Sequence, residues 1–130
     1  MMKEFHPIIQ EWFLNRFKKA TPPQVKGWPL LHQGKHTLIA APTGSGKTMA
    51  AFLVAIDRLV KESLEGRLDN SLQIVYVSPL RALSNDVKKN LEEPLEEIKK
   101  LIKERHQKTE VASGERKYTK HRDRTLVQFQ

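Results

Sequence analysis

Apolar residues recur at helical spacing in several stretches of the chain. Pro7, a residue favoured in the first turn of a helix, precedes one such stretch, whose apolar positions are Ile8, Ile9, Trp12, Phe13 and Phe17. We expect these aromatic side chains to pack in the core rather than to stack on bases. Proline disfavours helical backbone in the residue before it, so Thr21-Pro22-Pro23 ends this helix. A shorter helix is predicted over residues 24–31.

A long helix is predicted from Lys47 onward, with apolar residues at positions 52, 53, 56, 59 and 60. Asp57 follows this run, and we expect its side chain to face solvent. Further helices are predicted over residues 81–90 and from Pro94 to residue 102. Glutamates stand at positions 92, 93, 96 and 97, and Lys89 and Lys100 lie at i,i+4 spacing from the glutamates at 93 and 96, which is typical of a solvated helix face.

Two short apolar runs have the length of β-strands. Residues 37–41 immediately precede a glycine-rich turn, and residues 73–77 are rich in β-branched side chains with apolar groups on both faces. The order strand, turn, helix, strand is the βαβ unit of an α/β domain. The pattern therefore predicts an α/β fold with a small parallel sheet flanked by helices.

The turn at residues 41–48, Ala-Pro-Thr-Gly-Ser-Gly-Lys-Thr, has the chemistry of a phosphate-binding loop. Gly44 and Gly46 allow the backbone to curl so that successive N–H groups point at phosphate oxygens, beside the positive end of a helix dipole. Lys47 has the reach to contact β- and γ-phosphates, and the hydroxyl of Thr48 suits a magnesium ion. The strict pattern has glycine where this chain has alanine. The spacing and context predict a nucleoside triphosphate site.

The sequence of this loop resembles motif I of superfamily 2 helicases of the DEAD/DEAH type. Thr21-Pro22-Pro23-Gln24 resembles the Q motif of that family, and residues 78–83 resemble its motif Ia. The wider context is similar to the large helicase-related branch of ATP-dependent DNA helicases and translocases, on Trp12-Phe13, Gly27-Trp28 and Asn85-Asp86. The resemblance covers about residues 5–102 and combines three motifs in their family order.

The resemblance implies the N-terminal part of the first RecA-like motor domain, with ATP and Mg²⁺ as cofactors and nucleic acid, specifically DNA, as partner. Gln24 would bind adenine, an edge that an amide suits because it donates and accepts at once. Nucleic-acid contacts would come from Ser78 and Arg81. The ATP phosphates would lie against Thr43, Gly44, Ser45, Gly46, Lys47 and Thr48, with Thr48 also binding Mg²⁺.

Hydrolysis needs acidic residues that hold magnesium and prepare the attacking water. In the family both belong to motif II, an Asp-Glu pair after an apolar strand, and no segment of this chain has that pattern. We therefore expect an ATP-binding portion of a motor that is not hydrolytically competent alone, and a truncated or frameshifted chain that needs the rest of the motor or a partner.

Composition narrows the class of protein. A chain of 130 residues without cysteine allows one compact domain and excludes disulfides, a thiol nucleophile and cysteine-ligated metals. No run is long enough to span a membrane or to act as a secretion signal, so we expect a cytoplasmic protein. His32 and His36 are four residues apart, but Gly34 between them disfavours a helix, so we expect surface histidines rather than metal ligands.

Charge is concentrated towards the C-terminus. The formal net charge is +8, and residues 99–130 hold 10 basic against 4 acidic side chains, a net of +6. A basic block attracts phosphate-rich partners, although a solvated tail has the same composition. A second interpretation is therefore a non-catalytic nucleic-acid- or protein-interaction module that uses the basic C-terminal third. We divide the chain into a helical segment (1–36), a partial RecA-like region (37–105) and a basic tail (106–130).

Overall fold

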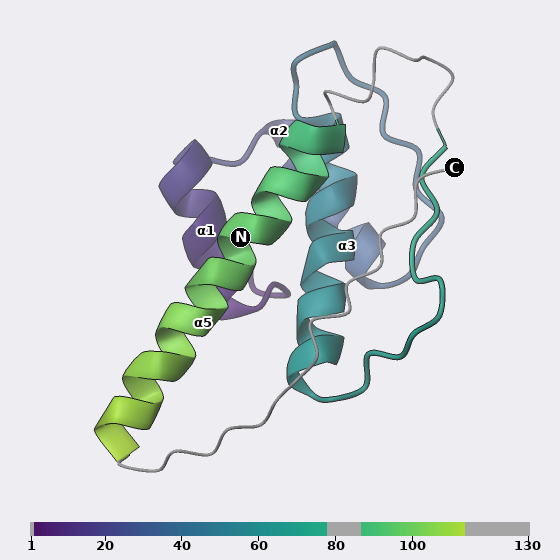
Figure 1. Ribbon diagram of the computed structural model, residues 1–130. Helices are drawn as coiled ribbons and strands as arrows, with labels where there is room; N and C mark the ends of the chain where they lie inside the picture. Colours follow the sequence, from purple (N-terminus) through teal and green to yellow (C-terminus); the bar gives the residue numbers. More distant parts are fainter. Residues whose placement is uncertain (1, 78–86, 114–130) are drawn as a thin grey trace.

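The computed structural model describes residues 2–77 and 87–113, with residues 108–113 described by their backbone only. The described chain is helical, and Figure 1 shows α5 crossing between α1 on one side and α3 on the other. The elements are α1 (Pro7–Phe17), α2 (Pro22–His32), α3 (Lys47–Leu64), the π-helical turn η2 (Lys88–Glu92) and α5 (Glu93–Ser113). None of these helices is both long and apolar enough to cross a membrane.

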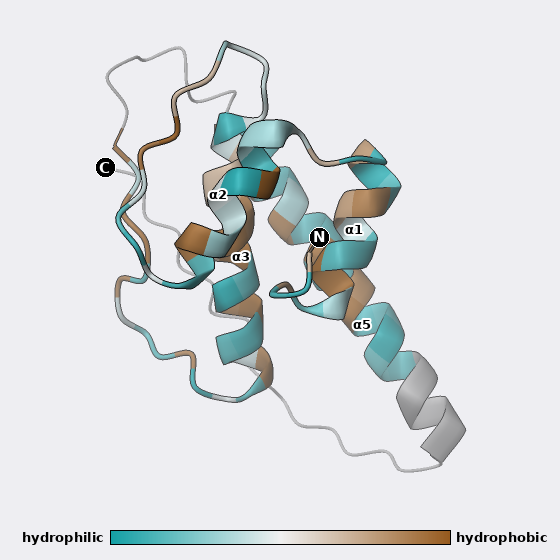
Figure 2. Cartoon of the chain, turned by 180° about the vertical axis from the view of Figure 1, so that it is seen from behind, coloured by the Kyte–Doolittle hydropathy of each residue, from teal (hydrophilic) through white to brown (hydrophobic). Residues whose placement is uncertain are grey.

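The apolar core lies where α1, α2, α3 and α5 meet. Buried hydrophobic side chains from these helices form one cluster, and Figure 2 shows hydrophobic (brown) and hydrophilic (teal) positions alternating along the same helices. The most deeply buried of these side chains are Ile9, Phe13, Trp28, Leu53, Ile56 and Ile98, each 0% exposed. Burial of such side chains is the main stabilising contribution to a fold of this size.

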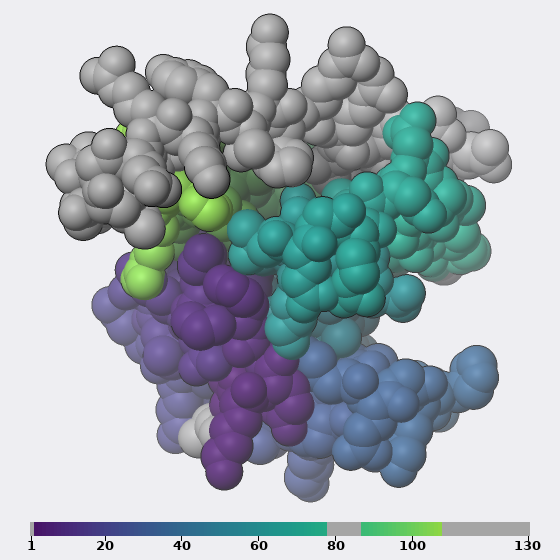
Figure 3. Space-filling model, turned by 90° about the horizontal axis from the view of Figure 1, so that it is seen from below, coloured from purple at the N-terminus to yellow at the C-terminus, as the bar shows by residue number. Residues whose placement is uncertain are grey.

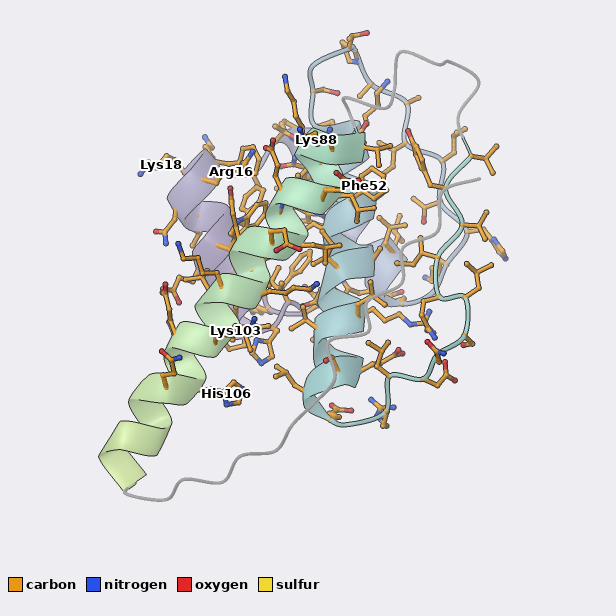
Figure 4. The ribbon with its side chains drawn as sticks, in the orientation of Figure 1. Arg16, Lys18, Phe52, Lys88, Lys103 and His106 are labelled. Atoms are coloured by element: carbon orange, nitrogen blue, oxygen red, sulfur yellow. The ribbon has the colours of Figure 1, made fainter. Side chains whose placement is uncertain are left out.

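Helix α1 is attached to α5 by both apolar and polar contacts. Trp12 is buried, and its indole Nε1 donates a hydrogen bond of 2.6 Å to the Glu97 carboxylate. Arg16 extends from α1 to the same carboxylate at 2.7 Å (Figure 4). The prediction that the aromatic residues of this helix pack in the core is confirmed for Trp12 and Phe13, whereas Phe17 is 40% exposed.

The start of α5 follows a π-helical turn that ends one residue before Glu93. Pro94, in the first turn of α5, is fully buried. Proline has no N–H to donate and its ring crowds the carbonyl four residues earlier, so a wider turn before it relieves that conflict. The predicted helix from Pro94 to residue 102 is present within α5, but the helical backbone begins earlier, at Lys88, and α5 continues to Ser113.

The two predicted strands, residues 37–41 and 73–77, do not form strands in the structure, and the described residues contain helices as their only regular elements. Each run touches the helices at one residue: Ile39 lies beside Gly27, and the ring of Tyr76, a residue that is 41% exposed, lies 5.0 Å from that of Phe52. Their outward side chains are uncovered, with Leu38 93% and Val77 84% exposed. A parallel sheet needs several paired strands with both faces covered, whereas these runs are largely exposed and have no ladder.

The segment between α3 and residue 77 is shaped by its polar residues. The carboxylate of Asp69 accepts hydrogen bonds from the hydroxyl and the backbone N–H of Ser71 and from the Gln73 amide. The Ser71 hydroxyl in particular lowers the pKa of the Asp69 carboxyl, because a hydrogen bond to the charged form favours it. This turn brings the chain back along α3 towards Tyr76.

Candidate nucleotide-binding site

The glycine-rich loop at residues 41–48 leads directly into α3. Gly44 and Gly46 both have φ of +81°, a left-handed backbone that side chains with a Cβ rarely adopt. The Ser45 N–H donates to the Pro42 carbonyl at 3.2 Å, which closes the turn, and the Ala50 N–H donates to the Gly46 carbonyl at 2.9 Å. The N–H groups at the start of α3 have no helical acceptor, so this end of the helix suits an anion.

The start of α2 is hydrogen-bonded to this loop. Thr21 and Gln24 form a capping box in which the Gln24 Oε1 accepts from the Thr21 N–H at 2.9 Å. The other end of the amide, Nε2, donates to the Gly46 carbonyl at 3.2 Å, and the Thr21 hydroxyl donates to the Ser45 carbonyl at 2.7 Å. Gln24 is only 4% exposed. The Q-motif-like segment and the phosphate-loop motif, 22 residues apart, thus meet through direct side-chain contacts.

Gly46 is held by sterics as well as by its backbone angle. A Cβ built on Gly46 would lie 2.4 Å from the Gln24 Nε2, whereas one built on Gly44 would meet nothing within 4 Å. We expect both Gly→Ala substitutions to cost about 1 kcal/mol through the left-handed backbone. Gly46→Ala should cost about 1–2 kcal/mol more, because it also displaces the buried Gln24 amide. Chemical denaturation followed by circular dichroism measures the difference.

The second variant needed is Gly46→Ala combined with Gln24→Ala. Removing the Gln24 amide also removes its clash with the new Cβ at position 46. The double variant should therefore be at least as stable as the sum of the two single-variant losses of stability predicts, and the coupling free energy between the two positions should be favourable. Equal stability of Gly44→Ala and Gly46→Ala would contradict the steric role assigned to Gln24.

The remaining loop side chains fit a phosphate group with magnesium. Lys47 lies back across the loop, where its Nζ donates to the Ala41 carbonyl at 2.5 Å, and the next residue, Thr48, is half-buried in the first turn of α3. The Ser45 hydroxyl oxygen is buried and has no hydrogen-bond partner in the described structure. An ammonium group, hydroxyls and helix N–H groups at one turn are the donors and ligands that phosphate and Mg²⁺ require. The described residues include no separate cluster of three or more His, Cys, Asp or Glu side chains that would hold a metal.

Two of the predicted site residues, Ser78 and Arg81, lie outside the described residues. Thr43 and Gly44 are exposed at the tip of the loop. The loop and Gln24 are therefore the part of the predicted site that the structure brings together.

The expectation that Asp57 faces solvent is wrong, because its side chain is 1% exposed. One carboxylate oxygen accepts from the His6 backbone N–H at 2.7 Å, and the other lies 2.8 Å from the Lys61 Nζ and 3.2 Å from the His32 Nε2. Figure 3 shows the N-terminal residues (purple) beside the teal residues in the middle of the chain. Burial of a carboxylate requires such partners, and here they join α1, α2 and α3.

The two histidines do not share one environment. His36 is exposed, as predicted, but the His32 side chain is only 13% exposed, and its ring packs edge-on against Phe5 at 4.4 Å. The difference arises because α2 continues through His32, one residue further than the predicted helix.

A family model, DEAD/DEAH box helicase, matches residues 21–127. The chain belongs to this family. The match spans both the Q-motif-like segment and the phosphate loop, so it contains the residues that the structure brings into contact. A RecA-like α/β fold is what this family implies, whereas the described residues of the chain form helices only.

Several relatives of this chain are named Lhr helicases. The chain is 51% identical over 96 residues to the "ATP-dependent helicase Lhr-Core" of Methanocaldococcus jannaschii, covering 74% of this chain and 11% of that protein. It is 44% identical over 98 residues to the "Lhr helicase/uracil glycosylase" of Escherichia coli, covering 72% and 6% respectively. The chain therefore spans about a tenth or less of these relatives' length. No solved structure matches it.

Proposed function

We propose that this chain is an ATP-binding portion of a helicase motor and that it binds ATP with Mg²⁺ at the loop of residues 41–48. The observation that carries this proposal is the contact of Gln24 with Gly46, which joins the Q-motif-like segment to a phosphate loop at the N-terminus of a long helix. Membership of the DEAD/DEAH box helicase family and relatives named ATP-dependent helicases support it.

Each loop residue has a separate task in this proposal. The backbone N–H groups at the start of α3 and the Ser45 hydroxyl would hold phosphate oxygens, and the Lys47 ammonium would exchange the Ala41 carbonyl for a phosphate. Bound Mg²⁺, with Thr48 as a ligand, would neutralise part of the charge on the phosphates. The Gln24 amide sets the position of Gly46 and, through its unused lone pair and N–H, would discriminate adenine.

Binding and hydrolysis are separable in this chain. Residues 1–130 contain no Asp-Glu pair at the end of an apolar strand, so we propose that they bind ATP without hydrolysing it. Ser78 and Arg81 are the proposed contacts to a nucleic-acid backbone, with DNA as the proposed substrate of the complete motor.

Equilibrium binding of a fluorescent ATP analogue to the full 130-residue chain tests the proposal. We expect saturable binding that requires Mg²⁺ and is reversed by chelation. Unlabelled ATP should compete several-fold better than GTP, and Gln24→Ala should reduce that preference. Phosphate release should stay at the buffer level with or without single-stranded DNA.

Three outcomes would overturn parts of this proposal. Equal competition by ATP and GTP would remove the adenine-reading role of Gln24. Phosphate release that depends on DNA would overturn the separation of binding from hydrolysis. A folded chain with no saturable binding would overturn the nucleotide site itself.

A further inference from the structure

Helices α2 and α3 are joined by three side-chain contacts spaced one helical turn apart on α2. Gln24 donates to the Gly46 carbonyl, Trp28 donates through its indole Nε1 to the Ala50 carbonyl, and the His32 Nε2 lies beside the Asp57 carboxylate, each at 3.2 Å. Residues four apart lie on one face of a helix. We call this set of three contacts the α2–α3 ladder.

The ladder extends from the phosphate loop to a buried carboxylate. Its first contact is at the N-cap of α3, in the proposed nucleotide site, and its third contact is about 12 Å further along α2 at 1.5 Å per residue. Trp28, in the middle, is 0% exposed and fixes the distance between the two helices. With the centre fixed, the tilt of α2 on α3 depends on its two ends.

The third contact joins the His32 ring to the Asp57 carboxylate. The His32 Nδ1 lies 3.0 Å from the Trp28 carbonyl, an acceptor, while its Nε2 faces the Asp57 carboxylate, also an acceptor. The other groups at this carboxylate are the Lys61 ammonium and the His6 backbone N–H, so the carboxylate is surrounded by donors from three elements.

We propose that His32 and Asp57 are positioning residues for the phosphate loop. By holding the C-terminal end of α2 against α3, they keep Gln24 in contact with Gly46 at the other end. Loss of the third contact lets α2 tilt about Trp28, which separates Gln24 from the loop and loosens its backbone. The importance of this inference for ligand binding rests on the proposed nucleotide site, but the order of the loop can be measured without any nucleotide.

Amide hydrogen exchange, resolved by NMR on the full chain, tests the inference. The reporters are the N–H groups of Ser45 and Ala50, which donate to Pro42 and Gly46 within and beside the loop. His32→Ala should accelerate their exchange about 5- to 10-fold, because the loss of one hydrogen bond lowers the free energy of local opening by a corresponding amount. His32→Gln should restore slow exchange, because its amide can still donate to the carboxylate.

A control separates positioning from general loss of stability. Leu91→Ala removes a core side chain on η2, 6% exposed and outside the ladder. Leu91→Ala should lower the global free energy of unfolding. The exchange rates of the two reporter N–H groups should rise by no more than that global loss of stability accounts for. In a Gln24→Ala background, His32→Ala should have no further effect on the reporters, because the first contact is already absent.

Equal reporter exchange in His32→Ala and Leu91→Ala, after scaling to global stability, would overturn the proposal. Full additivity of Gln24→Ala and His32→Ala would also overturn it, because the two residues would then act independently. Binding of the fluorescent ATP analogue is measured alongside. Absence of binding in the wild-type chain defeats the proposed function, while the exchange data still decide the positioning role.

Discussion

Replacing Lys47 by alanine is expected to weaken binding of the Mg²⁺-bound ATP analogue about 10- to 100-fold, the range for losing charge-assisted hydrogen bonds. The Nζ of Lys47 is the cationic group at the phosphate loop, and its contact in the structure is a backbone carbonyl of the same loop. The Ala41 carbonyl lies at the half-buried start of the loop, so the loss of its hydrogen bond from Lys47 should change the free energy of unfolding little. Fluorescence titration gives the affinity, and urea unfolding gives the stability.

Lys35→Ala provides the control for this experiment. It removes the same charge from an exposed position outside the loop, so it reports the effect of net charge alone on the attraction of an anionic ligand. We expect it to change affinity less than 3-fold at physiological salt, where distant exposed charges are screened. A loss of affinity in Lys35→Ala as large as in Lys47→Ala would show that binding depends on general charge and not on the loop.

Replacing Asp57 by alanine is expected to destabilise the chain by about 1–3 kcal/mol, the range for leaving buried donors without their hydrogen-bond acceptor. The side chain is 1% exposed and accepts from His6 while facing Lys61 and His32. Without it, donors from three elements lose their shared acceptor. Marginal proteins have total stabilities of about 5–15 kcal/mol, so this loss should be evident in the denaturation midpoint.

Two further variants serve as comparisons for Asp57→Ala. Asp57→Asn keeps an oxygen acceptor for the His6 N–H but loses the charge facing Lys61, so its stability should lie between that of wild type and alanine. Glu96→Ala removes an acidic side chain that is 77% exposed, and it should change stability by less than about 0.5 kcal/mol. An Asp57→Ala variant as stable as Glu96→Ala would show that the buried carboxylate does not stabilise the fold.

The helices of this chain could be predicted because their signals are local. Pro7 marks the start of α1, and the apolar stripe of α3 repeats at helical spacing, whereas the predicted second helix begins two residues after the observed start of α2 at Pro22. The strands could not be predicted in the same way, since a strand depends on a partner that its own residues do not specify. Residues 73–77 have strand-like composition, yet they lie in the structure without a ladder.

The candidate site likewise has one part that the local sequence specifies and another that depends on the fold. The loop residues follow from a motif of consecutive residues, whereas the contact between Gln24 and Gly46 joins distant segments and needed the fold. The burial of Asp57 had a signal in the sequence, because positions 53, 56, 57 and 60 fall on one face of a helix. A carboxylate on an apolar stripe indicates a buried polar centre whose partners come from elsewhere in the chain.

The close fit between Gln24 and Gly46 also constrains how this lineage can diverge. Any residue larger than glycine at position 46 meets the Gln24 amide, while a smaller residue at position 24 leaves the Gly46 carbonyl without its second donor. A change at position 46 should therefore be tolerated better after a change at position 24 has removed the amide. Even then the left-handed backbone at 46 continues to favour glycine, so position 24 should vary more readily than position 46 among descendants of this sequence.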